Sequence, residues 1–251
     1  MDLPIKVETV TNKGRTFHVI QEAQVTGGSK SRAIYAFMQA RDEYNEFVYA
    51  GPATGYAQYA LAYCAKLLDK KATVFLSSCP RVGNTIPTQG AIDNGATIIR
   101  SIQLKDAQEA AREYCSGDTS RFLCPFGMDD TEFHQIFVDK LRAAGMPDIA
   151  GNVTIWVTVG SGTLLRVLLE IYPNNKFGCV VVGKNIWEDQ FKPEDWARMT
   201  IYKSDLFFTQ NVKKRNAPPY NSVPNYDAKV WEFVRRFGKS GDYIYNVAGI
   251  N

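Results

Sequence analysis

Short apolar runs rich in β-branched and aromatic residues alternate along the chain with longer runs whose apolar positions recur every three or four residues. The short runs predict buried β-strands, and the longer runs predict amphipathic α-helices. Strands are expected at residues 17–21, 47–51, 72–76, 96–102, 152–158, 178–183, 202–208 and 243–247. Helices are expected at residues 33–40, 56–68, 85–94, 105–115, 130–144, 164–171 and 227–237. This alternation predicts an α/β protein with mainly parallel, twisted sheets flanked by helices.

The composition is that of an ordinary globular protein. The chain has 251 residues, of which 45% are hydrophobic and 22% charged, and these values exclude a disordered or collagen-like chain. A net charge of +3 is too small to indicate a polyanion-binding protein by itself. Only two histidines are present, His18 and His134, so a metal site with three histidines is excluded. We predict structural roles for both histidines and no metal site.

The cysteines indicate a reducing compartment. They lie at positions 64, 79, 115, 124 and 179, an odd number without a C-x-x-C pair. This pattern matches neither a zinc cluster nor a disulfide framework, so we predict a cytoplasmic protein. The first residues lack the basic and apolar run of a signal peptide, and no apolar stretch reaches the roughly 18 residues of a membrane span. No membrane partner is expected.

The first segment with candidate chemistry is G-G-S-K-S-R at residues 27–32, just before a predicted helix. Two glycines allow a loop to lie tightly against a ligand. Lys30 then suits either phosphate binding or condensation with a carbonyl group. The spacing of a P-loop is missing. Taken alone, the segment favours a solvated lysine beside a turn.

A second segment, G-S-G-T at residues 160–163, joins a β-branched strand to a helix. Successive backbone N–H groups, the helix N-terminus and two hydroxyl groups can form a phosphate cup there. The dinucleotide motif G-x-G-x-x-G is not completed, because Leu165 stands where its last glycine is required. A tight turn without a ligand is the alternative.

The third segment is P-N-Y-D-A-K at residues 224–229, at the start of a predicted helix. Asp227 suits a helix start because its charge complements the helix dipole, and Tyr226 suits a core aromatic position. Either residue is also available for chemistry.

Together and in this order, the three segments resemble the fold-type-II pyridoxal-phosphate enzymes, the tryptophan-synthase-β-like group. The nearest branch is that of D-cysteine desulfhydrase and aminocyclopropane-carboxylate deaminase. In that branch a G-G-N-K-x-R segment carries the Schiff-base lysine, which corresponds to Lys30, with Ser29 in place of the asparagine. An acid that follows the tyrosine of the third segment faces the pyridine nitrogen, a role that the resemblance assigns to Asp227. Its glycine-rich turn holds the cofactor phosphate and corresponds to Gly160, Ser161, Gly162 and Thr163.

The resemblance extends to the substrate side. A loop similar to S-x-G-N-x-x-Q grips the substrate carboxylate in the family, and P-A-T-G-Y-A-Q occupies its place at residues 52–58. This implies substrate contacts from Thr54, Gly55, Tyr56 and Gln58, with Tyr226 as a second acid or base. Two further residues depart from the family pattern. Tyr56 replaces the asparagine beside the phenolic oxygen of the cofactor, and Ala248 replaces a serine near its ring nitrogen, which leaves the reaction type open.

The resemblance implies a two-domain enzyme that binds pyridoxal 5'-phosphate. Residues 1–45 and 150–251 would form the larger, cofactor-binding domain, and residues 46–149 the smaller, substrate-side domain. The implied function is that of a lyase acting on an amino-acid-like substrate through Lys30, by deamination, β-elimination or decarboxylation. A homodimer is implied as well.

Three alternatives stay open. The chain is compact for the family and resembles phage-encoded proteins, which suggests an enzyme of phage DNA base hypermodification in the host cytoplasm. Its substrate would be an amino-acid-decorated nucleotide or DNA base, and the basic run at residues 213–215 supports this reading. Replacement of family residues at Ser29, Tyr56 and Ala248 suggests instead a degenerate, non-catalytic protein that binds the cofactor. The third alternative is a nucleotide-binding protein that uses residues 160–163.

Overall fold

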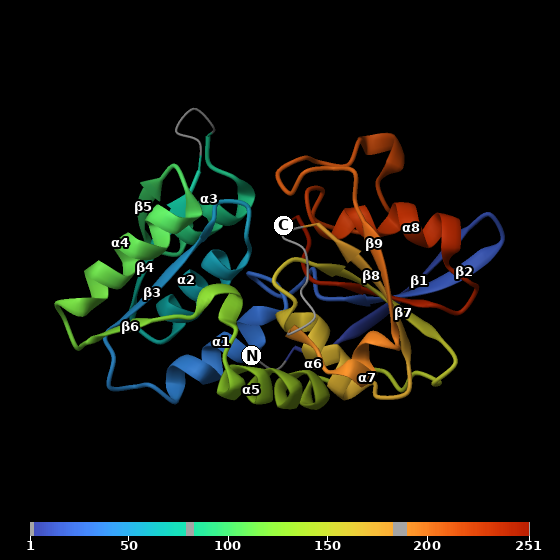
Figure 1. Ribbon diagram of the computed structural model, residues 1–251, viewed down its shortest axis with the longest axis horizontal. Coiled ribbons are helices and arrows are strands. Elements are labelled where there is room, and N and C mark those ends of the chain that lie inside the picture. Colours follow the sequence, from blue (N-terminus) through green and yellow to red (C-terminus); the bar gives the residue numbers. More distant parts are fainter. Residues whose placement is uncertain (1–2, 79–82, 183–189, 251) are drawn as a thin grey trace. The chain divides into compact units, whose positions relative to one another are not determined.

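The computed structural model describes residues 3–78, 83–182 and 190–250, and these form two compact units (Figure 1). The first unit is Val25–Lys140, and the second combines the residues up to Gln24 with those from Leu141 onward. Residues 25–45 lie in the first unit and residues 141–149 in the second, whereas the sequence assigned them to the larger and the smaller domain, respectively. The helix within residues 25–45, α1 (Lys30–Gln39), packs against α2 (Ala57–Leu67), where the thiol of Cys64 donates to the Ser31 carbonyl at 3.5 Å.

The first unit is built on a parallel four-stranded sheet in the order β5-β4-β3-β6. Its strands are β3 (Glu46–Pro52), β4 (Lys71–Ser77), β5 (Thr97–Ser101) and β6 (Arg121–Leu123). The central strand β3 is buried along almost its whole length. Helix α4 (Leu104–Ser116) covers one face through Ala107 and Ala111, and α2 and α3 (Ile86–Asp93) lie on the other side (Figure 1).

The second unit contains a sheet of six strands among the described residues, in the order β1-β2-β10-β7-β8-β9. Strands β1 (Lys6–Asn12) and β2 (Arg15–Gln21) form an antiparallel hairpin, and all other neighbours pair in parallel. The remaining strands are β7 (Thr154–Val159), β8 (Lys176–Val181), β9 (Met199–Lys203) and β10 (Tyr243–Asn246). Helix α8 (Val230–Phe237) packs on one face through Trp231 and Val234, and α6 (Thr163–Ile171) covers the other (Figure 1). Helix α5 (Thr131–Ala143) contains the boundary between the units, and α7 (Pro193–Trp196) precedes β9.

The predicted α/β class with mainly parallel sheets is confirmed, but one predicted strand is wrong. The strand expected at residues 202–208 is β9, Met199–Lys203, and residues 204–210 form a loop. The Ser204 hydroxyl accepts the Leu206 N–H at 3.2 Å, and this local hydrogen bond competes with strand pairing after Lys203. The helix expected from residue 227 begins as a 3₁₀ turn, Asp227–Lys229, ahead of α8.

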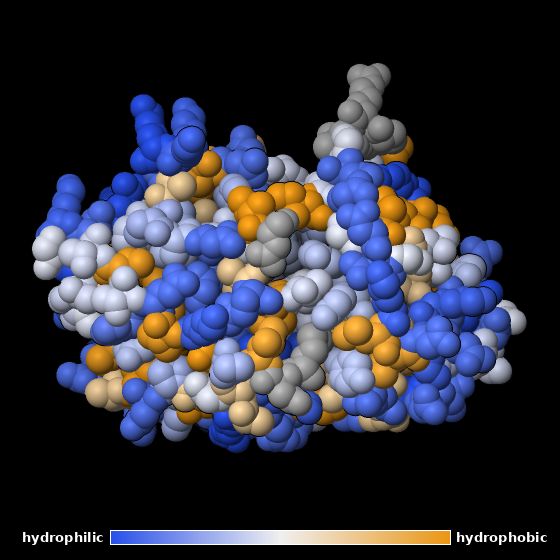
Figure 2. All heavy atoms as spheres, turned by 180° about the vertical axis from the view of Figure 1, so that it is seen from behind, coloured by the Kyte–Doolittle hydropathy of each residue, from blue (hydrophilic) through white to orange (hydrophobic). Residues whose placement is uncertain are grey.

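Strands β1 and β6 were not predicted, because β1 is largely exposed and β6 has only three residues. Cys79, Trp187 and Gly183, the last residue of a predicted strand, lie outside the described residues. None of the helices that the structure describes is both long and apolar enough to cross a membrane. On the face in Figure 2, hydrophobic residues form small groups separated by polar ones.

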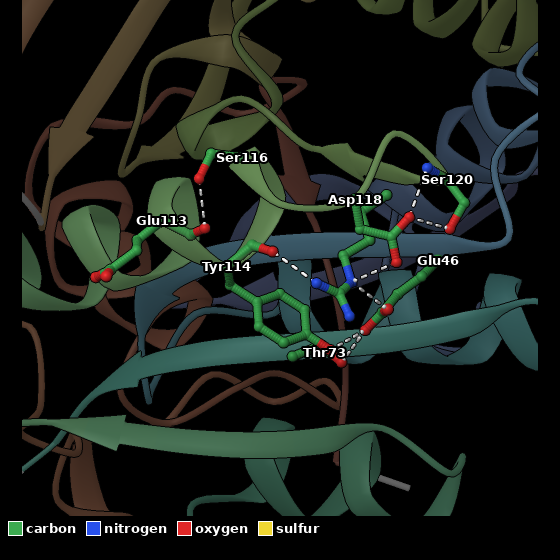
Figure 3. Close-up of polar contacts among 8 residues, drawn as sticks. Glu46, Thr73, Glu113, Tyr114, Ser116, Asp118 and Ser120 are labelled. Carbon is green, nitrogen blue, oxygen red and sulfur yellow. Dashed lines mark hydrogen bonds and ion pairs between the residues drawn. The ribbon is translucent and has the colours of Figure 1, made fainter.

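A buried acid stabilises the amino-terminal edge of the first sheet (Figure 3). Glu46 begins β3 and accepts hydrogen bonds from the hydroxyl of Thr73, the phenol of Tyr114 at 3.0 Å and Nε of Arg121 at 3.0 Å. These partners belong to β4, α4 and β6, so one carboxylate links three elements to the central strand. The Arg121 guanidinium also lies over the Tyr114 ring, 3.8 Å from its centre.

Replacement of this acid tests its role in the fold. Glu46→Ala removes the acceptor of a buried hydroxyl and of a phenol, and one of the acceptors of the Arg121 guanidinium. We expect it to lower the free energy of unfolding by about 2 kcal/mol. Urea denaturation monitored by circular dichroism measures the change. Glu113→Ala, an exposed acid on the same helix as Tyr114, is the control and should alter stability by less than ~0.5 kcal/mol. Equal effects of the two substitutions would contradict this account.

Candidate active site

Lys30 is the first residue of α1, and its side chain contacts a backbone carbonyl 97 positions later in the chain. Its Nζ donates to the Gly127 carbonyl oxygen at 2.6 Å. Gly127 lies in the turn Phe126–Met128 that follows β6, with φ of 68°. The turn amide also forms a hydrogen bond with the phenol of the buried Tyr49, and burial raises the pKa of that phenol to about 12. The amine of Lys30 is therefore held at a defined position beside the carboxyl end of the sheet.

The glycine pair before Lys30 has a steric reason. Gly27 and Gly28 have φ of 78° and 80°, in the left-handed region that favours glycine. A Cβ at Gly27 would lie 2.6 Å from the Cα of Ala60, so the turn packs directly on the α2 backbone. Ser29 is fully buried, and the Ser31 hydroxyl donates to the Thr26 carbonyl at 2.6 Å. These contacts fix where α1 begins and hence where Lys30 projects.

The loop at residues 52–58 joins β3 to α2 and is braced from inside. The carbonyl of Ala53 accepts hydrogen bonds from the Gln58 amide at 2.7 Å and from the hydroxyls of Thr85 and Thr88. Gly55 closes the turn through a hydrogen bond of its N–H to the Pro52 carbonyl at 2.9 Å. Gln58 is fully buried, so in this structure it supports the loop. The substrate contacts predicted for Thr54, Gly55, Tyr56 and Gln58 stay predictions.

Thr54 is the residue of this loop with an unused polar atom. Its hydroxyl oxygen is buried and has no hydrogen-bond partner within the described part of the chain. Tyr56 occupies the position before the first turn of α2, and its ring lies 6.3 Å from that of Tyr59. A buried hydroxyl without a partner is costly unless a ligand or water supplies one.

In the second unit, the G-S-G-T turn lies between β7 and α6, as the sequence predicts. Gly162 has φ of 85° and precedes the first residue of α6, Thr163. The hydroxyls of Ser161 and Thr163 are 3.1 Å apart. The first N–H groups of a helix have no acceptor within the helix, so this turn combines amide donors with two hydroxyls. Such a donor set suits a phosphate group.

Tyr226 lies directly beside this turn. A Cβ at Gly160 would lie 2.9 Å from the Tyr226 hydroxyl oxygen, so a glycine at this position allows the approach. The phenol also donates to the Thr158 carbonyl at 3.4 Å, while the hydroxyl of Thr158 is buried and lacks a partner among the described residues. Burial and the neighbouring Asp227 raise the pKa of Tyr226, which keeps the phenol protonated.

Asp227, the one acid among the candidate residues, is buried, with 1% of its surface exposed. Oδ2 accepts the Ala248 N–H at 3.2 Å, whereas Oδ1 is buried without a hydrogen-bond partner in the described structure. Burial raises the pKa of this carboxyl group to about 8, although backbone donors at Val247 and Ala248 oppose the rise. Ala248, which replaces a serine of the family pattern, thus contacts the acid through its backbone.

The candidate residues fall in both units. Lys30 and the loop at residues 52–58 belong to the first unit, and the G-S-G-T turn, Tyr226 and Asp227 belong to the second. Within the second unit, the structure brings Tyr226 to the turn and Asp227 to the terminal segment.

Sequence reasoning missed several contributors, namely Tyr49, Gly127, Thr158 and the Ala248 amide. The identity of a residue does not reveal what its backbone groups contact, so the roles of the Gly127 carbonyl and the Ala248 amide could not be predicted from the sequence. Cys124 is buried, and burial raises the pKa of its thiol. His18 lies on β2, where its ring faces Tyr243. No group of three or more His, Cys, Asp or Glu that could hold a metal occurs among the described residues.

The raised pKa of Asp227 predicts that the free energy of unfolding depends on pH. Because the carboxyl has a pKa of about 8 when folded and about 3.9 when unfolded, the folded state binds the proton more tightly. Its contribution to stability is fully present below pH ~4 and is lost as pH rises to ~8. Asp227→Asn removes this titration, so protein dialysed free of small molecules should lose roughly 2–3 kcal/mol less stability than wild type between pH 5.5 and 8.5.

Urea denaturation at the two pH values provides the measurement. Asp205→Asn changes an exposed acid of the same unit and should follow the wild type. Parallel pH dependence of wild type and Asp227→Asn would show that the acid is ionised in the folded protein.

No protein-family model matches the sequence, and no curated protein sequence matches it either. Solved structures do. An ACC deaminase homologue superposes with a TM-score of 0.78 at 14% identity, covering 98% of this chain and 89% of that one. Threonine deaminase isoform 2 from Solanum lycopersicum matches with a TM-score of 0.65 at 18% identity, covering 100% of this chain and 80% of that one. Serine racemase from Dictyostelium discoideum matches with a TM-score of 0.65 at 15% identity, covering 100% and 93%. The chain therefore has the fold of the fold-type-II pyridoxal-phosphate enzymes, as the sequence predicts.

Proposed function

We propose that this protein is a pyridoxal-phosphate-dependent lyase that acts on an amino-acid-like substrate, with Lys30 as the residue that carries the cofactor. The observation that carries the proposal is the buried Oδ1 of Asp227, which lacks a hydrogen-bond partner among the described residues. A buried carboxylate needs a charged donor, and a protonated pyridine nitrogen is such a donor.

The residues present fit the cofactor at three of its groups. The amine of Lys30 suits the aldehyde, the donors of the G-S-G-T turn suit the phosphate, and Asp227 suits the ring nitrogen. The serine of the family pattern is dispensable at position 248, because the Ala248 amide already holds Oδ2 and leaves Oδ1 for the ring. One nitrogen needs only one such partner.

When bound, pyridoxal phosphate delocalises the electron pair left by a bond broken at the substrate Cα. The chain supplies the rest. Asp227 holds the proton at the ring nitrogen, and the fixed Lys30 amine moves a proton at Cα once it is released. The Gly127 carbonyl, which accepts a hydrogen bond from Nζ at 2.6 Å, would hold the ammonium form of Lys30.

Other residues orient the substrate in this proposal. The Thr54 hydroxyl has an unused donor and acceptor for a substrate carboxylate, and the Ala53 carbonyl keeps the loop in place. The protonated Tyr226 phenol, beside the G-S-G-T turn, is an acid for a leaving group. Solved structures of deaminases and of a diaminopropionate ammonia lyase share this fold, which supports the lyase class. The substrate, the choice among deamination, β-elimination and decarboxylation, the homodimer and the cytoplasmic location stay predictions.

Reduction with borohydride tests the attachment. Protein incubated with pyridoxal phosphate and then reduced should gain a pyridoxyl group on Lys30, identified by peptide mass spectrometry. Lys30→Ala should lose both this adduct and the near-visible absorption band, whereas Lys66→Ala, an exposed lysine of the same unit, should keep both. A protein that stays colourless and unlabelled would overturn the proposal. A labelled protein without turnover on a panel of amino acids would favour the non-catalytic alternative, and protection against heating by nucleotides alone would favour the nucleotide-binding one.

The second candidate function is action on an amino-acid-decorated DNA base. One observation favours it: Lys213, Lys214 and Arg215 are exposed, and residues 206–226 contain no acid. The exposed Phe207 of the same stretch offers a ring for stacking on a base.

Salt dependence distinguishes this candidate. Binding of single-stranded DNA that carries the modified base should weaken by at least ~tenfold between 50 and 200 mM salt. Simultaneous replacement of Lys213, Lys214 and Arg215 by alanine should flatten that dependence. Absence of binding at low salt excludes the DNA substrate and leaves the lyase proposal intact.

A further inference from the structure

Lys229 is a buried lysine with no role in the function proposed above. Only 2% of its surface is exposed, and it ends the 3₁₀ turn Asp227–Lys229. Its Nζ donates to the Phe207 carbonyl at 2.8 Å and reaches the Phe208 carbonyl at 3.5 Å. A fully buried lysine without such partners is rare, because removal of the ammonium from water is costly. The two carbonyls partly offset that cost.

Both carbonyls belong to the loop at residues 204–210, which follows β9. Two further contacts tie this loop to the same segment. The Phe208 ring packs edge-on against Tyr226, with centres 6.0 Å apart, and the Asn225 amide donates to the Phe208 carbonyl at 3.4 Å. Phe207, in contrast, is 77% exposed, so burial of its own side chain does not hold the loop.

We propose that Lys229 is a positioning residue whose ammonium anchors the loop at residues 204–210 and thereby holds Tyr226 against the G-S-G-T turn. The chain of contacts runs from Nζ to the loop carbonyls, from the Phe208 ring to Tyr226, and from Tyr226 to Gly160. The part concerning Tyr226 rests on the proposed function, because Tyr226 matters to chemistry only if the site acts on a substrate. The anchor itself does not.

The anchor depends on the charge of Lys229. Burial lowers the pKa of this ammonium to about 8, and no charged group is a further cause. The charged residues on the elements packed against it are Asp205 in the loop, Asp227 in the 3₁₀ turn, and Glu232, Arg235 and Arg236 on α8, while β7 carries none. Neutral Lys229 is a weaker donor than the ammonium, so the loop should open more often above pH 8.

Limited proteolysis measures the opening directly. Chymotrypsin cleaves after Phe207, whose ring is exposed but whose carbonyl is held by Lys229. The rate of cleavage of the wild type is divided by the rate for a free peptide with the sequence of residues 203–211. This ratio should rise roughly fivefold or more from pH 7 to pH 9, because the cleavage rate follows the open population of the loop. A constant ratio would overturn the dependence of the loop on the titration of Lys229 in this range, and the variants below decide the anchor itself.

Variants separate the anchor from general packing. Lys229→Met keeps much of the side-chain volume but cannot donate, and cleavage at pH 7 should rise about tenfold and lose its pH dependence. Lys229→Arg keeps a cation at both pH values and should restore slow cleavage at both. Lys239→Met, an exposed lysine of the same unit, should match the wild type. Circular dichroism checks that each variant folds, and cleavage of folded Lys229→Met at the wild-type rate would contradict the anchor.

The link to chemistry needs the cofactor-loaded enzyme. Lys229→Met should lower kcat with little change in KM, as does loss of an acid that is no longer in place. Faster cleavage with an unchanged kcat would keep the anchor and overturn the part concerning Tyr226. Failure of Lys30 to carry the cofactor would instead overturn the proposed function, and the proteolysis result would still decide the anchor.

Discussion

The carboxyl group of Asp227 is the constraint on which the second unit's candidate site depends. One oxygen accepts an amide from the segment after the last strand, and the other is buried with no partner among the described residues. This contact joins the 3₁₀ turn to the terminal segment; Tyr226 directly precedes the turn, and Lys229 ends it. An unpaired buried carboxyl is costly, so the fold keeps it protonated or supplies a cation. The pKa of Asp227 is raised because the buried carboxylate lacks such a partner.

Close backbone approach decides the geometry of the two glycine segments. At Gly27 the turn before Lys30 packs on the α2 backbone, and at Gly160 the phenol of Tyr226 comes within reach of the turn before α6. A side chain at either position would separate parts that the proposed chemistry needs together. In both segments, glycine thus serves a contact with a distant residue as well as the local turn.

Most of the fold could be predicted from the sequence because strand and helix periodicities are local properties. The parallel α/β class and the turns at Lys30 and at residues 160–163 lie where the pattern places them. The prediction failed at residues 202–208, where Ser204 forms a local turn. It also missed β6, whose Arg121 donates to Glu46, 75 positions away in sequence. The placement of residues 25–45 likewise depends on packing between α1 and α2.

By itself the sequence determined the order of the elements and the residue types available for chemistry, namely Lys30, the G-S-G-T turn, Tyr226 and Asp227. Only the tertiary structure decided which of their polar atoms have hydrogen-bond partners. Gly127 receives the Lys30 ammonium across 97 positions, and Ala248 reaches Asp227 across 21. It also revealed that Lys229 is buried beneath a loop that the sequence assigned to a strand. Burial and hydrogen bonding depend on residues that are distant in sequence, so no local pattern of residues encodes them.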